Sequence, residues 1–294
     1  MATTAQWVAG ARPRTLPAAV APVLLGTAAA LRVGEADAVR ALLALAVALA
    51  LQVGVNYAND YSDGIRGTDE VRAGPVRLVG QRLAAPRAVK RAAFASFAVA
   101  GVLGLLLVVL AQAWVMLPLG ALAVLAAWRY TGGDNPYGYR GLGEVYVFLF
   151  FGLMATIGTE YTQTLSVSWF GVAGAVGVGA VASAILVANN LRDIPTDTEH
   201  GKHTLAVRLG DARTRTFYVA LVGASVVALV VMAWWEPWAL LALGSLALAW
   251  RGVRVVRAGT TGPGLVPVLA ATGVYEVVYA VLVLAGVGIA AGLG

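Results

Sequence analysis

Long apolar runs alternate with short polar connections along the whole chain. A helix of about 20 mostly apolar residues spans the ~30 Å hydrocarbon layer of a membrane. Nine runs reach or approach this length, and they predict nine transmembrane helices. The runs are Leu16–Leu31, Val39–Tyr57, Ala88–Leu110, Ala113–Trp128, Gly143–Thr159, Phe170–Leu191, Thr214–Met232, Trp238–Arg251 and Leu265–Ala290. Because only helices satisfy their own backbone hydrogen bonds within lipid, we expect an all-α integral membrane bundle.

The composition agrees with a membrane protein. Of the 294 residues, 60% are hydrophobic and 12% are charged, whereas a soluble domain carries about 25% charged residues. No polar segment is long enough to fold alone, so residues 1–294 are predicted to form a single transmembrane domain. The chain contains no cysteine, which excludes disulfides and metal sites built on thiolates.

The basic residues divide unequally between the two sides of the predicted bundle. Nineteen of the 21 Lys and Arg residues lie on the side of the N-terminus, and only Arg32 and Arg40 lie on the other. Since cytoplasmic loops of membrane proteins are rich in Lys and Arg, this split predicts a cytoplasmic N-terminus and an external C-terminus in the cell membrane. The charges sit in short loops between apolar runs, which indicates a bilayer partner rather than nucleic acid. With eight further spans behind the first run, we do not expect a cleaved signal peptide.

Two polar stretches, 56–83 and 189–210, follow the second and the sixth apolar run. Their candidate metal ligands are Asn59, Asp60, Asp63, Asp193 and Asp197. Residues four apart share a face of a helix, so Asn59 and Asp63 should lie together, as should the two later acids. Pro195 is predicted to interrupt regular backbone hydrogen bonding between these later acids.

Carboxylates that lie close together cannot all remain ionised without a cation. Oxygen ligands without cysteine favour Mg²⁺, which typically binds one or two carboxylates together with the phosphates of a substrate. The four aspartates are therefore candidates for catalysis as well as for metal binding. The alternative is that they pair with neighbouring arginines at a solvated surface. Two acidic clusters at two helix ends favour the functional interpretation, because acids near the membrane are costly.

Basic residues follow the acids closely in both stretches. The candidate diphosphate ligands are Arg66, Arg72, Arg77 and Lys202. Arginine binds phosphate through a planar fork, and lysine binds it as a compact charge. Orientation of the chain in the membrane is an alternative reason for the same positive charges. A metal with cations beside it points to a diphosphate, and a site in a membrane indicates a lipid tail on that diphosphate.

The motifs resemble those of a known family. Asn59-Asp60-x-x-Asp63 and Asp193-x-x-x-Asp197 are similar to the two aspartate-rich motifs of the UbiA superfamily of intramembrane aromatic prenyltransferases. The resemblance covers nearly the whole chain. It is most specific in residues 11–26, 130–144 and 189–210, which resemble the branch of the family that acts in menaquinone biosynthesis.

The resemblance implies an activity and its substrates. A polyprenyl diphosphate would donate its prenyl group to 1,4-dihydroxy-2-naphthoate, with Mg²⁺ as cofactor and with loss of CO₂, at a site facing the cytoplasm. The candidates for binding the acceptor or shielding the allyl cation are Tyr130, Tyr139, Glu144 and Arg192. Anchoring at the membrane interface is the alternative role of the tyrosines.

Two other functions compete with this one. Within the superfamily, the acceptor could be 4-hydroxybenzoate. From another class, a transporter of an anion or a lipid would place its site near the middle of the bilayer on broken helices. Here the acids cluster at the predicted cytoplasmic ends of helices, which argues against transport.

Overall fold

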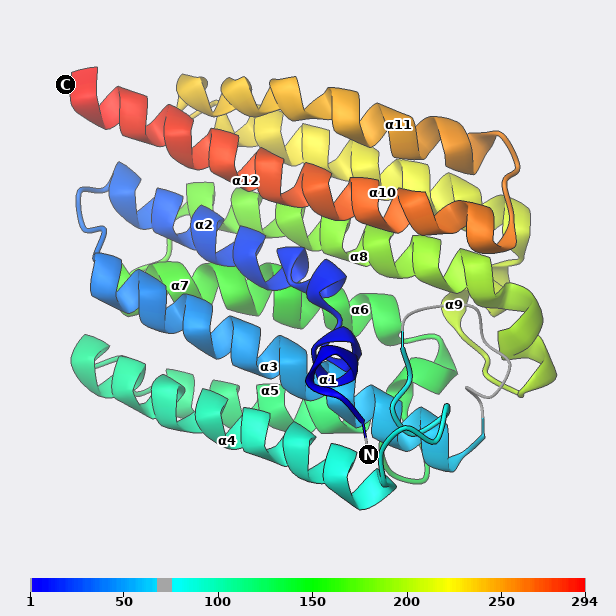
Figure 1. Cartoon of the computed structure of the whole chain (residues 1–294). Helices are drawn as coiled ribbons and strands as arrows, with labels where there is room; N and C mark the ends of the chain where they lie inside the picture. The colour runs from blue at the N-terminus through cyan, green and yellow to red at the C-terminus, as the bar shows by residue number, and fades with distance from the viewer. Residues whose placement is uncertain (1, 68–75, 294) are drawn as a thin grey trace.

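A computed structural model describes residues 2–67 and 76–293, and within these ranges every regular element is a helix. Figure 1 shows the long helices side by side in one bundle. The elements of the first half are α1 (Thr4–Gly10), η1 (Pro13–Thr15), α2 (Pro17–Arg32), α3 (Ala38–Ile65), α4 (Pro86–Ala111), α5 (Met116–Arg129), η2 (Tyr137–Arg140), α6 (Gly143–Val147) and η3 (Phe148–Met154). Those of the second half are α7 (Ala155–Thr164), α8 (Trp169–Glu199), α9 (Leu205–Leu209), α10 (Asp211–Met232), η4 (Pro237–Ser245), α11 (Leu246–Arg257), η5 (Gly262–Leu265) and α12 (Val266–Leu293).

Each predicted span has a helical counterpart, but not all of them meet the requirements for crossing a membrane. In the described part of the chain, seven helical segments are long and apolar enough, and the pair Thr4–Thr15 and Pro17–Arg32, bent by 49°, makes an eighth. The predicted span Ala113–Trp128 corresponds to α5, which has only 14 residues. The all-helical membrane fold is thus confirmed, and the count of nine spans stays a prediction.

Local signals in the sequence set where the helices begin. Asp37 caps α3 through a 3.0 Å bond from the backbone N–H of Arg40 to its carboxylate. Ser168 caps α8 in the same way, accepting a 3.0 Å bond from the N–H of Gly171. Such caps satisfy backbone groups that have no partner within the helix. Proline occupies the first position of α2 and of α4. An N–H group there would have no acceptor within the helix, so its absence in proline costs nothing.

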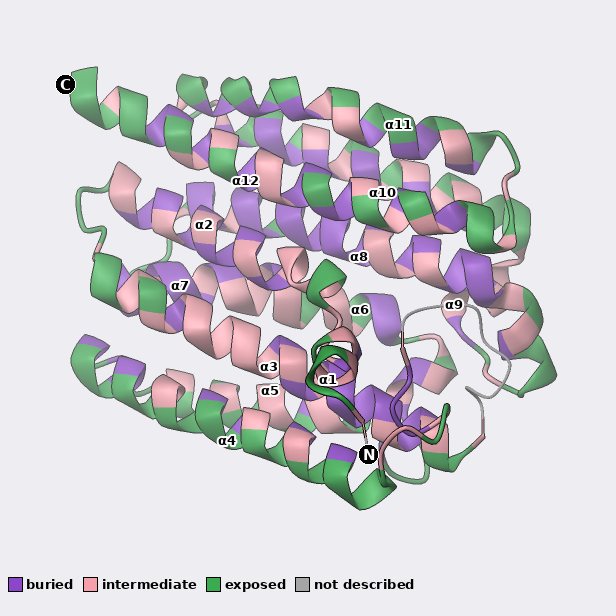
Figure 2. Cartoon of the chain, viewed as in Figure 1, coloured by how far each residue is buried: buried purple, intermediate pink, exposed green. Residues whose placement is uncertain are grey.

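The central helix of the bundle is α8. Of its apolar stretch, 72% is buried within the protein, whereas the buried share is 17–39% in the other six segments that are long and apolar enough to cross a membrane alone. Figure 2 shows this difference as a buried α8 between helices whose outer faces are exposed. Exposed faces rich in Leu and Val are expected where a helix meets lipid.

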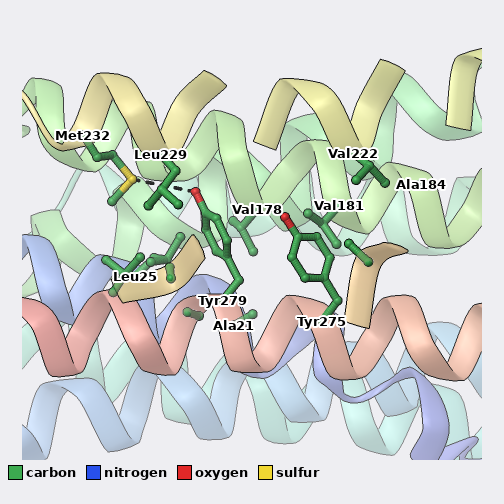
Figure 3. Close-up of a cluster of buried hydrophobic side chains, with 14 of the residues drawn as sticks. Ala21, Leu25, Val178, Val181, Ala184, Val222, Leu229, Met232, Tyr275 and Tyr279 are labelled. Atoms are coloured by element: carbon green, nitrogen blue, oxygen red, sulfur yellow. Dashed lines mark hydrogen bonds between the residues drawn. The ribbon is translucent and has the colours of Figure 1, made fainter. Parts of the chain in front are cut away.

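Two tyrosines of α12 pack against α8 and α10. Tyr275 and Tyr279 point from α12 toward α8 and α10, where they lie among aliphatic side chains (Figure 3). The hydroxyl of Tyr275 lies 2.8 Å from the hydroxyl of Ser225 on α10, and that of Tyr279 donates to the Ser225 carbonyl at 3.3 Å. Buried hydroxyls need such partners, so these tyrosines serve packing of the bundle.

Candidate active site

The first motif lies on the last two turns of α3. The helix continues past the predicted end at Tyr57 to Ile65, so Asn59 and Asp63 share one face. Asn59 accepts a 2.8 Å hydrogen bond at Oδ1 from the hydroxyl of Thr131. Asp63 accepts a 2.7 Å bond at Oδ1 from the hydroxyl of Tyr139. The motif therefore holds the connection between α5 and α6 against the end of α3.

Asp60 has a different environment from its neighbours. Its side chain is fully buried, and its two oxygens accept hydrogen bonds from the backbone N–H groups of Leu78 at 2.7 Å and Val79 at 3.1 Å. A carboxylate that accepts two backbone N–H groups forms strong, charge-assisted bonds. Asp60 thus anchors Leu78 and Val79, which precede α4, to the end of α3.

Tyr139 connects the two motifs. Its hydroxyl binds Asp63 of the first motif, and the Lys202 Nζ, from the second polar stretch, lies 4.9 Å from the centre of its ring. The Arg66 guanidinium lies 5.3 Å from the centre of the same ring and donates to the carbonyl oxygens of Thr131 and Gly133. Cations at these distances are attracted by the negative charge on the ring face. Two predicted diphosphate ligands therefore flank one tyrosine.

The second motif lies wholly on α8. The helix continues through Pro195 to Glu199, so both acids lie on one helix, as their spacing predicts. Proline has no N–H to donate, so the regular hydrogen bond is missing at Pro195 and the long helix tolerates this loss.

Arg192 and Asp193 form a buried pair on this helix. Asp193 accepts two 2.7 Å bonds from Arg192, one at each oxygen, and Arg192 also donates to Asn189 Oδ1 at 2.9 Å. The Asp197 side chain is buried, and its backbone carbonyl accepts a 2.8 Å bond from the Lys202 N–H. Asp193 therefore orients the side chain of Arg192, and the backbone of Asp197 positions the start of the loop that carries Lys202.

A chamber of about 1150 Å³ lies beside both motifs. Its polar end is lined by Arg12, Arg14, Asn59, Asp63, Arg77, Tyr130, Thr131, Asn189, Asn190, Arg192 and Lys202. The rest of the wall is mostly apolar and comes from α3, α4, α5 and η3, and it reaches Leu107 and Val108 near the far end of α4. The chamber joins a charged end to a long apolar interior.

An aromatic wall lies next to the polar end. The rings of Tyr137 and Tyr146 are stacked at 3.7 Å, Tyr130 meets Tyr137 edge to face at 5.4 Å, and Phe150 continues the row 6.0 Å from Tyr146. Burial, reinforced by the neighbouring Tyr130 and Tyr146, raises the pKa of the Tyr137 phenol. It stays protonated and donates to the Ala126 carbonyl at 2.8 Å.

Glu144 lies just behind the chamber wall on α6. One of its oxygens, Oε1, accepts a 2.9 Å bond from the side-chain amide of Asn190. The other oxygen is buried and has no hydrogen-bond partner among the described residues. A buried polar atom without a partner is costly and calls for an explanation.

The N-terminal segment contributes two cations that were not among the predicted site residues. Arg12 and Arg14 line the chamber. The amide of Asn56 on α3 holds this segment by donating to the Ala11 carbonyl at 2.8 Å and to the Thr15 hydroxyl at 2.9 Å. In the sequence, the feature that could have indicated this contact is Asn56, a polar residue near the end of an apolar run.

The predicted site residues separate into two groups. Those that line the chamber are Asn59, Asp63, Arg77, Lys202, Tyr130 and Arg192. Those that lie outside its lining are Asp60, Arg66, Tyr139, Glu144, Asp193 and Asp197. Arg72 falls outside the described residues.

The donors at the polar end of the chamber fit Mg²⁺. Asp63 offers a carboxylate there, and Asn59 and Asn189 offer amide oxygens. Within residues 2–67 and 76–293, no three acidic or histidine side chains form a ready metal-binding group. In sites that bind phosphate esters, Mg²⁺ typically takes only one or two carboxylates and completes its shell with phosphate and water. The geometry fits a metal that binds together with its substrate.

Several related proteins share much of this sequence. The protein named 1,4-dihydroxy-2-naphthoate octaprenyltransferase of Mycobacterium leprae is 56% identical over 283 residues, covering 96% of both chains. The Escherichia coli protein of the same name is 40% identical over 234 residues, covering 78% of this chain and 76% of its own.

Solved structures and a family model point the same way. The structure of a UbiA homolog from Archaeoglobus fulgidus bound to GPP and Mg²⁺ matches this fold with a TM-score of 0.69 at 15% identity, covering 96% of this chain and 99% of that one. The model of the UbiA prenyltransferase family matches residues 19–264. The chain therefore belongs to the UbiA prenyltransferase family.

Proposed function

We propose that this protein transfers an all-trans polyprenyl group from a polyprenyl diphosphate to 1,4-dihydroxy-2-naphthoate, giving demethylmenaquinol (the reduced form of demethylmenaquinone), diphosphate and CO₂. The observation that carries the proposal is the chamber, whose charged end suits a diphosphate and whose apolar interior suits a prenyl chain. The naphthoate is favoured as acceptor by the names of the two relatives, which are 56% and 40% identical to this chain.

The polar end would bind the diphosphate and Mg²⁺. Asn59 and Asp63 face the chamber and are the first candidates for metal binding, while Arg77 and Lys202 supply cations for the phosphate oxygens. Asp60, Asp193 and Asp197 are further predicted ligands. Asp60 and Asp193 would first exchange their present partners, the loop backbone and Arg192. Arg66, stacked on Tyr139, completes the positive charge around this end, and Arg72 is predicted to add to it. Bound Mg²⁺ would neutralise charge that develops on the leaving diphosphate.

The reaction itself requires the allylic C–O bond to break, with its electron pair leaving on the diphosphate. The basic side chains stabilise that charge in a site where water is scarce. The naphthoate carbon that carries the carboxylate then bonds to the allyl carbon, and loss of CO₂ returns the electron pair of the broken C–C bond to the ring and restores its aromaticity. Tyr130 and Tyr146 line the chamber beside the polar end, where their rings can shield the cation. The apolar interior keeps water from capturing it.

Glu144 is proposed to act through Asn190. The carboxylate fixes the amide of Asn190, which lines the chamber and can bind an oxygen of the acceptor. Glu144 is thus a positioning residue.

The proposed membrane arrangement is nine spans with a cytoplasmic N-terminus in the cell membrane. In Figure 1 the α2–α3 connection and the C-terminus lie at one end of the bundle, and α9 and the α11–α12 connection lie at the other. The second end carries Lys202, Arg254 and Arg257, so the charge asymmetry supports an active site that faces the cytoplasm.

The decisive experiment is an assay of the purified protein with one donor and two acceptors. With octaprenyl diphosphate, Mg²⁺ and 1,4-dihydroxy-2-naphthoate, we expect the prenylated product and an equal amount of released diphosphate. EDTA should stop both, and added Mg²⁺ should restore them. Prenylation of 4-hydroxybenzoate alone would refute the acceptor, and no diphosphate release with either acceptor would refute the enzyme.

A further inference from the structure

A second, smaller groove of about 470 Å³ lies on the outer face of the bundle, between α5 and the helix formed by η3 and α7. Its floor and sides include Leu119 and Leu122 of α5 and Leu149 and Ile157 of the facing helix. Leu119, Leu122 and Leu149 are exposed, so the groove faces the lipid of the bilayer. Of the described residues that line the groove, only Tyr161 has a hydroxyl, amide or charged group in its side chain.

The groove and the large chamber share part of their walls. Met116, Phe150, Met154 and Gly158 line both spaces. The separation between them is therefore only about one side chain thick. Methionine has three rotatable bonds and adapts its shape easily, and two of the four shared residues are methionines.

Gly158 makes room for Met116 at this boundary. A Cβ atom at position 158 would lie 2.8 Å from Cε of Met116, closer than real Cβ contacts allow. The methionine tip can occupy its place only because residue 158 has no side chain. The two residues form a movable partition between chamber and groove.

The partition lies at the end of the chamber that is remote from the charges. Met116 begins α5, directly after the turn that follows α4, whereas Asp63 and Lys202 lie at the opposite end of the bundle. A prenyl chain whose diphosphate is held at the polar end would run along the chamber toward this partition. A chain longer than the chamber would have to leave it sideways there.

We propose that the groove between α5 and α7 holds the distal isoprene units of a long polyprenyl donor, which enter it past Met116. The proposal rests on the proposed prenyl transfer and adds a subsite that distinguishes long donors from short ones. The apolar lining excludes the diphosphate and the naphthoate carboxylate, because neither charge would find a partner there. Branched hydrocarbon suits such a surface, and continuity with the chamber selects the donor tail over an unrelated chain.

The test compares long and short donors on a blocked partition. Gly158→Leu should fill the boundary and lower kcat/KM for octaprenyl diphosphate by about tenfold or more. The same variant should stay within about twofold of the parent for geranyl diphosphate, whose two units end inside the chamber. The control is Gly223→Leu on the exposed face of α10, where the added side chain meets open space, and both donors should behave as in the parent.

A second test, by photolabelling, does not require the protein to tolerate a larger side chain. In the parent protein, a diazirine on the last isoprene unit of octaprenyl diphosphate should label residues 115–122 or 149–161. Equal losses with both donors in Gly158→Leu, or labelling confined to other helices, would overturn the proposal. So would labelling of the groove by a photoactivatable phospholipid that octaprenyl diphosphate does not displace. Failure of the parent protein to prenylate the naphthoate with either donor would instead refute the proposed function.

Discussion

At the scale of single residues, Tyr139 is the point where the two halves of the candidate site meet. Its hydroxyl orients the Asp63 carboxylate, and its ring lies beneath the cations Arg66 and Lys202. A metal ligand is commonly held by a second group, and loss of that group lowers metal affinity or activity by about 10- to 100-fold. Tyr139 has the geometry of such a positioning residue.

Tyr139→Phe tests this role, since it removes the hydroxyl and keeps the ring. We expect kcat/KM to fall about tenfold and the Mg²⁺ concentration for half-maximal activity to rise. The apparent Tm in detergent should change little. Tyr137→Phe is the matched control, because it loses a hydrogen bond to the Ala126 backbone rather than to a carboxylate. An unchanged Mg²⁺ dependence in Tyr139→Phe would show that the hydroxyl does not orient a ligand.

Asp60 and Asp63 are predicted to respond differently to loss of charge. Asp63→Asn keeps the shape of the side chain and should lower activity by about 100-fold or more, with the apparent Tm nearly unchanged. Asp60→Ala should leave the N–H groups of Leu78 and Val79 without partners, at about 1–3 kcal/mol in stability for each buried group. Melting curves and initial rates on both variants separate the two roles. Equal Tm losses in both variants would contradict this division.

At the scale of elements, the packing of α8 depends on close backbone contacts. A Cβ on Gly152, in the π-helical segment η3, would lie 2.5 Å from Cα of Gly179 on α8. Small residues allow helices in membranes to approach this closely. The π-helical turn lies in the middle of a chamber wall, and such turns are frequent at functional sites. η3 carries Phe150 and Met154, which face the chamber and the second groove.

Gly152→Ala should therefore separate η3 from α8. Overpacking of a tight contact costs about 1–3 kcal/mol, so we expect a lower apparent Tm together with a change in donor affinity. Gly223→Ala, on the exposed face of α10, has open space around its Cβ and serves as the control. A Gly152→Ala protein with unchanged Tm and KM would show that the helices can move apart at little cost.

At the scale of the whole molecule, the few cations on the predicted external side have structural partners. Arg40 pairs with Asp37 and donates to the Gln163 carbonyl at 3.1 Å and to the Leu110 carbonyl at 3.3 Å, near the ends of α7 and α4. Arg32 donates to the Trp235 carbonyl at 3.3 Å. Cations beside the last carbonyls of helices are favourable. These two arginines therefore stabilise the bundle without contradicting the orientation drawn from the other 19.

The absence of cysteine from the sequence makes that orientation simple to test. Glu35→Cys lies in the α2–α3 connection and Ala258→Cys in the α11–η5 connection, and both positions are exposed. In intact cells or spheroplasts, a membrane-impermeant maleimide should label the first variant directly and the second only after permeabilisation. Labelling in the reverse order would invert the proposed topology.

The apolar pattern correctly predicted which segments form helices, but it did not predict where each helix ends. Each predicted run became a helix because a segment in lipid must bond its own backbone. The apolar runs end at Tyr57 and Leu191, whereas α3 continues to Ile65 and α8 to Glu199, because packing within the bundle overrides local signals from polar residues and proline. The four-residue spacing of the acids was the signal for both continuations. The short α5 shows the limit of the pattern, because hydropathy indicates burial in lipid but not the number of turns that form.

The candidate site could be predicted as a set of residues but not as an arrangement. Sequence spacing placed Asn59 with Asp63 on one face, and the structure agrees. It could not show that Asp60 would bind a loop backbone or that Arg192 would pair with Asp193, because both depend on which groups the fold brings near. Arg12 and Arg14 were likewise counted only as loop charges, although they line the chamber.

The sequence by itself determined that this is a helical membrane protein, which of its ends carry acids and cations, and which family it resembles. These properties are local, since they follow from runs of apolar residues and from short motifs. Only the tertiary structure decided that Tyr139 joins the two motifs, that a chamber links the charged end to an apolar interior, and that a groove lies behind Met116. Those features arise between segments far apart in the chain, and their positions depend on how the helices pack.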